Sequence, residues 1–157
     1  MPRPTHDPFE DGVKPFICFS IYAANLAFTR AYKPLLDALG LTYPQYMVLV
    51  ALWAEDGQTV GGLGEKLFLE SSTLTPLLKR LDGQGHVTRT RDPADERQVR
   101  VRLTALGRRL REAAKDVPGC ILEASGMSRE NLRKLSAEIA QLRENLLATA
   151  PDRRAAG

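Results

Sequence analysis

The chain has 157 residues, of which 43% are apolar, and this length and composition predict one globular domain with a substantial core. The first residues do not combine a basic start with an apolar run, and no apolar stretch approaches the roughly 18 residues of a membrane span. We therefore expect a cytoplasmic protein with no membrane partner. The two cysteines, Cys18 and Cys120, match no zinc spacing, CxxC redox motif or secreted disulfide framework, and we expect neither a metal nor a cofactor.

The net charge of +3 is unevenly distributed. Residues 79–111 contain ten lysines and arginines against four acids, so this segment carries +6 and the remainder of the chain carries −3. A basic segment in a mildly acidic body is typical of a surface that binds nucleic acid. A run of charges is more often an ordinary solvated surface, so this interpretation depends on the structural context of the segment.

Helical patterns dominate the first half of the chain. A long helix is expected over about residues 15–39, since proline is favoured in a first turn and Gly40 is placed to end it. A second helix is expected from Pro44, and "EDGQTVGG" ends it. A short third helix follows over residues 63–67.

A fourth helix follows, with Ser71 or Ser72 expected as its N-cap and leucines on one face at positions 74, 77, 78 and 81. Small groups on the opposite face allow close approach to base edges, and cations there can bind phosphate or guanine. An ordinary amphipathic surface helix has the same pattern, so this helix alone does not establish DNA binding. The residues expected to bind DNA from this face are Ser72, Thr75, Pro76, Lys79 and Arg80.

The period changes from 3.6 to 2 in "VTRTRDPADERQVRVRLT", which predicts a β-hairpin whose strands are joined by the loop "DPADER". Short helices followed by a basic hairpin indicate a winged helix-turn-helix, in which the second helix of the motif lies in the major groove of DNA. Arg97, at the hairpin tip and close to Asp95, is expected to enter an A·T-rich minor groove. The hairpin residues expected to bind DNA are Arg89, Arg91, Asp95 and Arg97.

Thr104 is expected to cap a further helix that runs to Ala113, and a helical pattern returns over about residues 128–148. The predicted fold is therefore mainly α, with a small β-hairpin wing.

Cys18 would lie in the first turn of the long first helix, where unpaired N–H groups and the positive end of the helix dipole stabilise a thiolate. Tyr22 lies one turn further on, and its phenol could donate a hydrogen bond to that thiolate. Tyr32 lies about 21 Å along the same helix and cannot reach Cys18 of its own chain. Cysteines in apolar stretches are more often inert packing residues and tyrosines commonly fill cores, so these residues alone leave both interpretations open.

The order of a long first helix, a winged helix and further helices, with "ADERQVRVRLTALG" across the wing, resembles the MarR family of regulators. The segments "CFSIY", "YKPLLDALGLTYPQY", "LTPLLKRL" and "VPGCIL" are similar to the organic hydroperoxide sensors of that family, the OhrR group. The resemblance covers about residues 14–148. It implies a single MarR-like domain over residues 1–157, with dimerisation helices at about 15–40 and 105–148 and the winged helix-turn-helix at about 43–103.

The resemblance also implies a function. It implies a homodimeric repressor that binds a pseudo-palindromic operator in double-stranded DNA and releases it when an organic hydroperoxide oxidises Cys18. It implies that Tyr32 and Tyr43 support the thiolate, and Tyr32 must then come from the partner subunit. Apolar residues near Cys18 would favour an apolar peroxide over hydrogen peroxide.

"VPGC" is similar to the OhrR proteins that carry a second cysteine. This similarity implies that a sulfenic acid formed at Cys18 condenses with a nearby thiol, and the resulting disulfide protects Cys18 from overoxidation. The resemblance places both cysteines in intertwined regions of the dimer, so Cys120 of the other subunit is the expected partner. A disulfide requires Cα atoms within about 7 Å, and Cys120 as a small packing residue without a partner stays an alternative.

Three functions from different classes remain open. The first is the redox-switched repressor. The second is a MarR-like repressor that is released by a small phenolic or anionic ligand and whose cysteines are structural. The third is a thiol peroxidase; against it, the central third of the chain has the pattern of a DNA-reading module and no thioredoxin-like βαβ pattern is evident. We therefore expect a repressor and not an enzyme.

Overall fold

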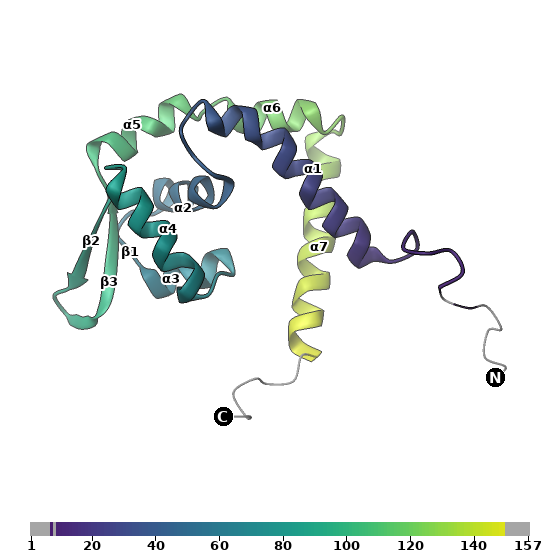
Figure 1. Cartoon of the computed structure of the whole chain (residues 1–157), viewed down its shortest axis with the longest axis horizontal. Coiled ribbons are helices and arrows are strands. Elements are labelled where there is room, and N and C mark those ends of the chain that lie inside the picture. Colours follow the sequence, from purple (N-terminus) through teal and green to yellow (C-terminus); the bar gives the residue numbers. More distant parts are fainter. Residues whose placement is uncertain (1–6, 8, 150–157) are drawn as a thin grey trace. The chain divides into compact units, whose positions relative to one another are not determined.

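The computed structural model describes residue 7 and residues 9–149 (Figure 1). It divides into two compact units, of which the first extends to Val117 and the second begins at Pro118. The outer ends of the domain predicted over residues 1–157 lie outside the described residues. No helix in the described part of the chain has the length and apolar content needed to cross a membrane.

The first helix, α1, spans Ile17–Asp37. It begins two residues later than predicted, because Phe16 is the N-cap and has extended backbone angles. Gly40 follows the helix with a φ of +68°, a left-handed conformation that glycine adopts without strain. The N–H of Leu41 then donates to the carbonyl of Leu36 at 3.0 Å, so the predicted role of Gly40 in ending this segment is confirmed.

Helix α2 spans Tyr43–Ala54 and starts with a capping box. The Thr42 hydroxyl accepts from the Gln45 N–H at 3.4 Å, and the Gln45 side chain accepts from the Thr42 N–H at 2.9 Å. Pro44 lies in the first turn, as predicted. Val48, Leu49 and Leu52 are fully buried, so α2 supplies the centre of the core.

Strand β1 (Gln58–Thr59) and helix α3 (Val60–Leu67) follow α2. The sequence predicted only a break before the short helix, since a strand of two residues has no readable period. Helix α4 spans Ser71–Gly83 and its N-cap is Glu70, without a side-chain capping bond. The predicted cap at Ser71 or Ser72 was therefore wrong, because both serines already lie inside the first turn.

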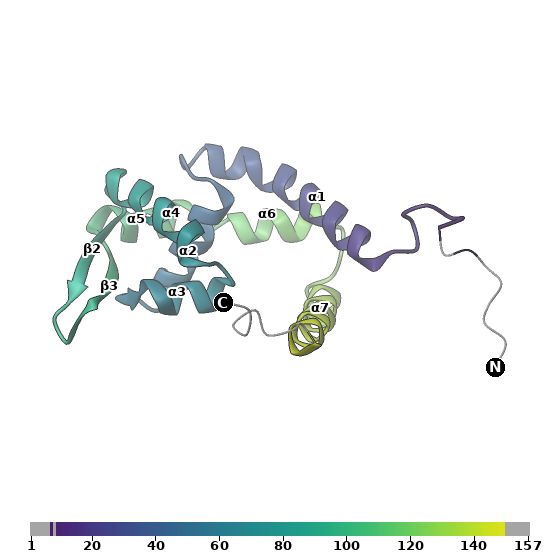
Figure 2. The same ribbon diagram turned by 60° about the horizontal axis from the view of Figure 1, so that its bottom comes forward.

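Strands β2 (Val87–Asp92) and β3 (Asp95–Leu103) form the predicted hairpin, and β3 also pairs with β1 in a sheet of order β1-β3-β2. All pairs are antiparallel, with Val87 opposite Leu103 and Asp92 opposite Asp95. The predicted loop "DPADER" is therefore mostly strand and leaves only residues 93–94 as the turn. In both views the hairpin of β2 and β3 projects past α3 and α4 (Figures 1 and 2).

Helix α5 spans Ala105–Ala113 and is capped as predicted by Thr104, whose hydroxyl accepts from the Gly107 N–H at 3.0 Å. The core of the first unit lies among α2, α3, α4 and the sheet. It is built mainly from leucines and valines, including Leu63, Leu74, Val87 and Val101. The predicted mainly α fold with a winged helix-turn-helix is confirmed.

The second unit contains helices α6 (Val117–Ala124) and α7 (Arg129–Thr149). Helix α6 was not predicted, since Pro118 and Gly119 indicated a break. Proline is tolerated in the first turn of a helix, where its missing N–H has no partner to lose. Cys120 consequently lies within α6 and not between helices. Helix α7 has no buried residue among those described.

Candidate functional site

The exposed face of α4 has the composition that the leucine spacing predicted. Leu74, Leu78 and Leu81 are at most 1% exposed and anchor the helix in the core. Thr75 is partly buried at the edge of the opposite face. The face therefore offers small groups first and cations in its second half. Its exposed predicted residues are Ser72, Pro76, Lys79 and Arg80.

A cleft of about 360 Å³ lies between the first turns of α3 and α4 and the wing. It brings together Thr75 from α4, Arg89 from β2 and Arg97 from β3, which the sequence placed in three separate segments. Ser71 lines this cleft, and Ser72 does not belong to its lining. The remaining lining residues are Thr59, Val60, Gly61, Leu78, Gln98 and Val99.

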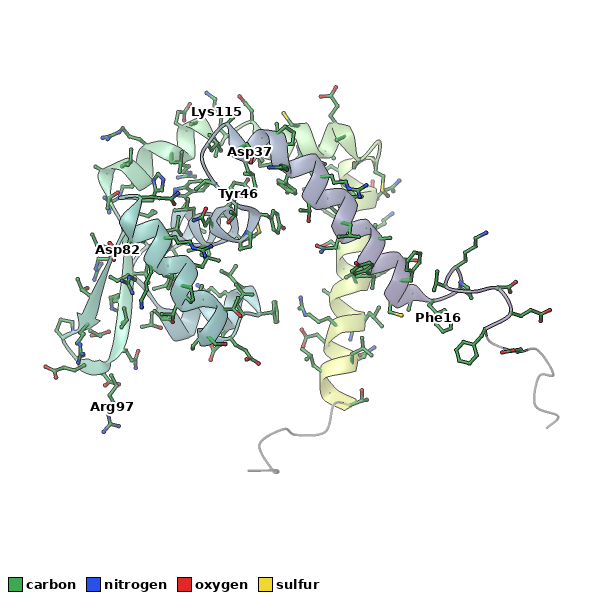
Figure 3. The ribbon with its side chains drawn as sticks, in the orientation of Figure 1. Phe16, Asp37, Tyr46, Asp82, Arg97 and Lys115 are labelled. Atoms are coloured by element: carbon green, nitrogen blue, oxygen red, sulfur yellow. The ribbon has the colours of Figure 1, made fainter. Side chains whose placement is uncertain are left out.

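Asp95 organises the end of the wing. Its carboxylate accepts from the backbone N–H of Arg97 at 3.1 Å and from the side-chain amide of Gln98 at 3.2 Å. The Arg97 side chain extends away from the end of the hairpin (Figure 3). Asp95 thus fixes the backbone beneath Arg97, and the DNA contacts expected of both residues stay predictions.

Arg89 and Arg91 lie on β2 in different surroundings. The Arg89 Nε donates to the Asp82 carboxylate at 3.0 Å, which ties β2 to the end of α4. Asp82 offsets part of the positive charge that Arg89 would present to a phosphate. Arg91 is exposed and pairs with Val99 of β3.

Asp92, which is buried, and Arg100, which is partly buried, form an ion pair that was not predicted from the sequence. The Asp92 carboxylate accepts from the Ala94 N–H at 2.9 Å and is paired with the Arg100 guanidinium. The Ala94 N–H and then Arg100 hold the pKa of this carboxyl below its usual value. Arg100 Nη1 also donates to the Gly57 carbonyl at 2.6 Å, so one arginine joins the wing turn to the segment before β1. The signal that could have found it is the strand register, which places Arg100 opposite Thr90, two residues from Asp92 on β2.

Cys18 is the second residue of α1 and is exposed, so its thiol lies in the first turn as predicted. Phe16 precedes it as the N-cap (Figure 3) and stacks on Phe9 with ring centroids 6.3 Å apart. Tyr22 lies one turn further along α1 and is 61% exposed. The first turns of α1 therefore present a thiol and a phenol to solvent.

Tyr32 and Tyr43 lie together in one chain. Their ring centroids are 4.9 Å apart, and the ring of Tyr46 lies 6.0 Å from that of Tyr32. Burial, followed by the neighbouring Tyr43 and Tyr46, raises the pKa of Tyr32 to about 12. Burial also raises the pKa of Tyr43. Both phenols are therefore protonated at neutral pH and can donate hydrogen bonds.

A cleft of about 260 Å³ lies beside these two rings. We call it the tyrosine cleft. It is formed by the last part of α1 and by the segment that leads into α2. Its lining residues are Thr29, Tyr32, Lys33, Leu36, Asp37, Leu41, Thr42, Tyr43 and Pro44.

Cys120 is exposed and lies in the second compact unit, whereas Cys18 lies in the first. Their pairing stays a prediction. Among the described residues there is no group of three or more histidine, cysteine or acidic residues that could hold a metal ion.

Residues 30–113 match the transcriptional regulator SarA/Rot family. The chain belongs to this family of MarR-type winged helix regulators. It is 48% identical over 130 residues to the organic hydroperoxide resistance transcriptional regulator of Bacillus subtilis (strain 168), an alignment that covers 83% of this chain and 88% of that one. The resemblance to the MarR family and to its hydroperoxide sensors is thereby confirmed.

Two solved structures of AbfR, a protein of Staphylococcus epidermidis, have the same fold. Reduced AbfR bound to DNA matches with a TM-score of 0.72 and 37% identity, covering 83% of this chain and 91% of that one. A disulfide-formed AbfR matches with a TM-score of 0.59 and 38% identity, covering 80% and 88%. Members of the family are transcriptional regulators, so the chain is a regulator of this class.

Proposed function

We propose that this protein is a redox-sensing repressor that binds a pseudo-palindromic operator as a homodimer and releases it when an organic hydroperoxide oxidises Cys18. The observation that carries the proposal is the exposed thiol in the first turn of α1, in a chain that also presents a winged helix-turn-helix. The similarity to a regulator of organic hydroperoxide resistance supports the choice of oxidant.

DNA binding is assigned to α4 and the wing. Helix α4 would enter the major groove with its exposed face, where Lys79 and Arg80 bind phosphate or guanine. Arg97, which extends from the end of the wing, would enter the minor groove. The likeness to AbfR, solved in its reduced form on DNA, supports this arrangement.

Dimerisation is supported by apolar side chains that the chain leaves exposed on its long helices. On α7, exposed and partly buried apolar residues together recur alternately every three and four positions, the spacing of a helix-helix seam. On α1, Ile17, Phe19, Leu26 and Phe28 are each more than 40% exposed. A second copy of the chain would cover both sets. The α7 stripe consists of the exposed Leu135, Ile139 and Leu146 and the partly buried Leu132 and Leu142.

The sensing chemistry starts at the Cys18 thiolate. The sulfur attacks the terminal oxygen of the hydroperoxide, the one that carries the hydrogen, and the O–O bond breaks. The alkoxide that leaves takes up a proton and becomes an alcohol. Cys18 becomes a sulfenic acid. Tyr32 and Tyr43 of the partner subunit would stabilise the thiolate before attack, because their protonated phenols donate hydrogen bonds.

Cys120 is assigned as the resolving residue. Its thiol attacks the sulfenic sulfur of the other subunit, which forms a disulfide and releases water. The exposure of both thiols and the similarity to a protein solved in a disulfide form support this step. The bond would draw the dimerisation helices together and change the spacing of the two α4 helices, which must match one turn of DNA, about 34–36 Å.

The proposal is tested by a binding titration of the reduced protein on an operator that the reduced protein selects from random duplexes. Cumene hydroperoxide should weaken binding at least about tenfold, and dithiothreitol should restore it. Unchanged affinity after the Cys18 thiol has been consumed would reject the redox switch.

A second candidate function rests on the tyrosine cleft, whose lining includes Tyr32, Lys33 and Tyr43. Two phenols beside a lysine, which is paired with Asp37 of the same lining at 2.8 Å, suit a small phenolic or anionic ligand that would compete with Asp37 for Lys33. Such a ligand would release the operator while the cysteines stay structural. Induction that persists after both thiols have been alkylated would favour this candidate over the redox switch.

A further inference from the structure

Gln84 links the end of α4 to the segment between α1 and α2. It is the C-cap of α4, and its backbone N–H donates to the Arg80 carbonyl at 2.9 Å. Its side-chain amide donates to the Gly40 carbonyl at 3.4 Å, and its side-chain oxygen accepts from the Gln45 amide at 3.3 Å. One side chain therefore holds two points of a segment that lies about 40 residues earlier in the chain.

Gln45 continues this connection to the tyrosine cleft. It is only 5% exposed, and its side-chain oxygen accepts from the Thr42 N–H at 2.9 Å. Thr42 and Tyr43 both line the cleft. Tyr43 and Gln45 thus share the first turn of α2, and Gln45 is bonded directly to Gln84.

Apolar contacts also join these elements. Leu36 and Leu41 belong to the same core as Leu78 and Leu81 of α4. Apolar packing is non-directional, whereas a hydrogen bond weakens steeply when its geometry changes. The leucines therefore keep the elements in contact, and the amide bonds of the exposed Gln84 add a directional link between them.

We propose that Gln84 is a positioning residue that couples the tyrosine cleft to the recognition helix α4. This inference rests on the proposed function, because the cleft is where the partner's Cys18 would be supported. With Gln84 bonded, a change at Tyr43 shifts the end of α4 that carries Lys79 and Arg80. Without these bonds, α4 keeps its packing on the core but follows the change at the cleft less closely.

The test is the operator affinity of Gln84→Met, which keeps the length of the side chain but loses both amide hydrogen bonds. Affinity is measured for the reduced protein and after cumene hydroperoxide, and the loss on oxidation is compared with that of the wild type. Gln141→Met is the matched control, since Gln141 is an exposed glutamine bonded only one turn away, to Asn145 on the same helix.

Gln84→Met should bind the operator like the wild type when reduced, within about twofold. Its loss of affinity on oxidation should be smaller than that of the wild type by a factor of about 2–30, the range by which single residues modulate coupling between sites. Gln141→Met should behave as the wild type in both states.

Equal loss in Gln84→Met and the wild type would overturn this inference and leave the proposed function intact. Weak binding by reduced Gln84→Met would also overturn it, since Gln84 would then be needed for the DNA-bound structure itself. A wild type that keeps its affinity after oxidation would instead reject the proposed function.

Discussion

At the scale of single residues, the tyrosines beside the cleft give the proposed thiol chemistry its hydrogen-bond donors. Their proximity could not be predicted from the sequence, because Tyr32 and Tyr43 belong to different helices and only the turn at Gly40 brings their rings together. The positions of Cys18 and Tyr22 could be predicted, since both depend only on where α1 begins. The bridge at Gln84 could not, since its partners lie 39 and 44 residues away.

Tyr32→Phe and Tyr43→Phe should each slow the oxidation of Cys18 by cumene hydroperoxide roughly tenfold, because a hydrogen bond to a charged group contributes about 1.5–3 kcal/mol. The measurement is the rate of thiol loss at neutral pH, where the raised pKa of Tyr32, about 12, keeps its phenol protonated. Tyr46→Phe is the matched control, because Tyr46 lies beside Tyr32 but outside the lining of the cleft. Unchanged rates in both test variants would remove the tyrosines from the sensing site.

At Gly107 the space that a side chain would need is already filled by neighbouring atoms. A Cβ there would lie 2.1 Å from the His86 carbonyl oxygen, and the Gly107 carbonyl accepts from the Trp53 indole at 2.9 Å. Gly107→Ala should lower the free energy of unfolding by about 1–3 kcal/mol, since α5 must shift from the sheet. Denaturant unfolding measures this change. Gly83→Ala, where a Cβ meets open space, should change stability little, and equal stability of the two variants would contradict the packing described for α5.

At the scale of elements, the sequence predicted best where a pattern repeats. The alternation in β3 and the leucine spacing in α4 each extend over several repeats, and both elements were found where the pattern placed them. Strand β1 and helix α6 were missed because the first is two residues long and the second starts with proline and glycine. The wing turn was predicted too long, since the bonds of Asp92 to Ala94 and Arg100 continue the strands beyond the hydrophobic alternation.

The wing should contribute to operator binding through Arg97. Arg97→Ala should weaken binding, because a cation is lost from the negative potential of the minor groove. The slope of log affinity against log salt concentration should fall by up to about 1 for each subunit, since fewer counterions are then displaced from the DNA. Arg129→Ala serves as the control, because Arg129 is an exposed arginine of α7 outside the basic segment of residues 79–111. The measurement is a set of binding titrations at several salt concentrations. Wild-type affinity in Arg97→Ala would exclude the wing from the DNA interface.

At the scale of the whole molecule, the function requires a second copy of the chain. Tyr32 lies too far along α1 to serve its own Cys18, α1 leaves apolar residues exposed, and the apolar residues of α7 have the spacing of helix-helix contacts. Neither dimer geometry nor the approach of two cysteines follows from a single sequence, because both depend on contacts between chains.

Oxidation should crosslink the dimer. After organic hydroperoxide, a non-reducing gel should contain a species of twice the monomer mass that dithiothreitol removes, and mass spectrometry should identify a peptide linking Cys18 to Cys120. Cys120→Ser should still lose its Cys18 thiol but should overoxidise more readily, because no second thiol captures the sulfenic acid. A disulfide confined to monomers would contradict the assignment of Cys120 to the partner subunit.

The central claim is that the oxidation state of Cys18 controls operator binding. The most direct measurement compares the operator affinities of wild type and Cys18→Ser before and after cumene hydroperoxide. Both proteins should bind equally when reduced, because Cys18 is exposed and lies outside the leucine core that holds α4. After treatment only the wild type should release the operator. Release by Cys18→Ser to the same extent, or its failure to bind before treatment, would contradict the account.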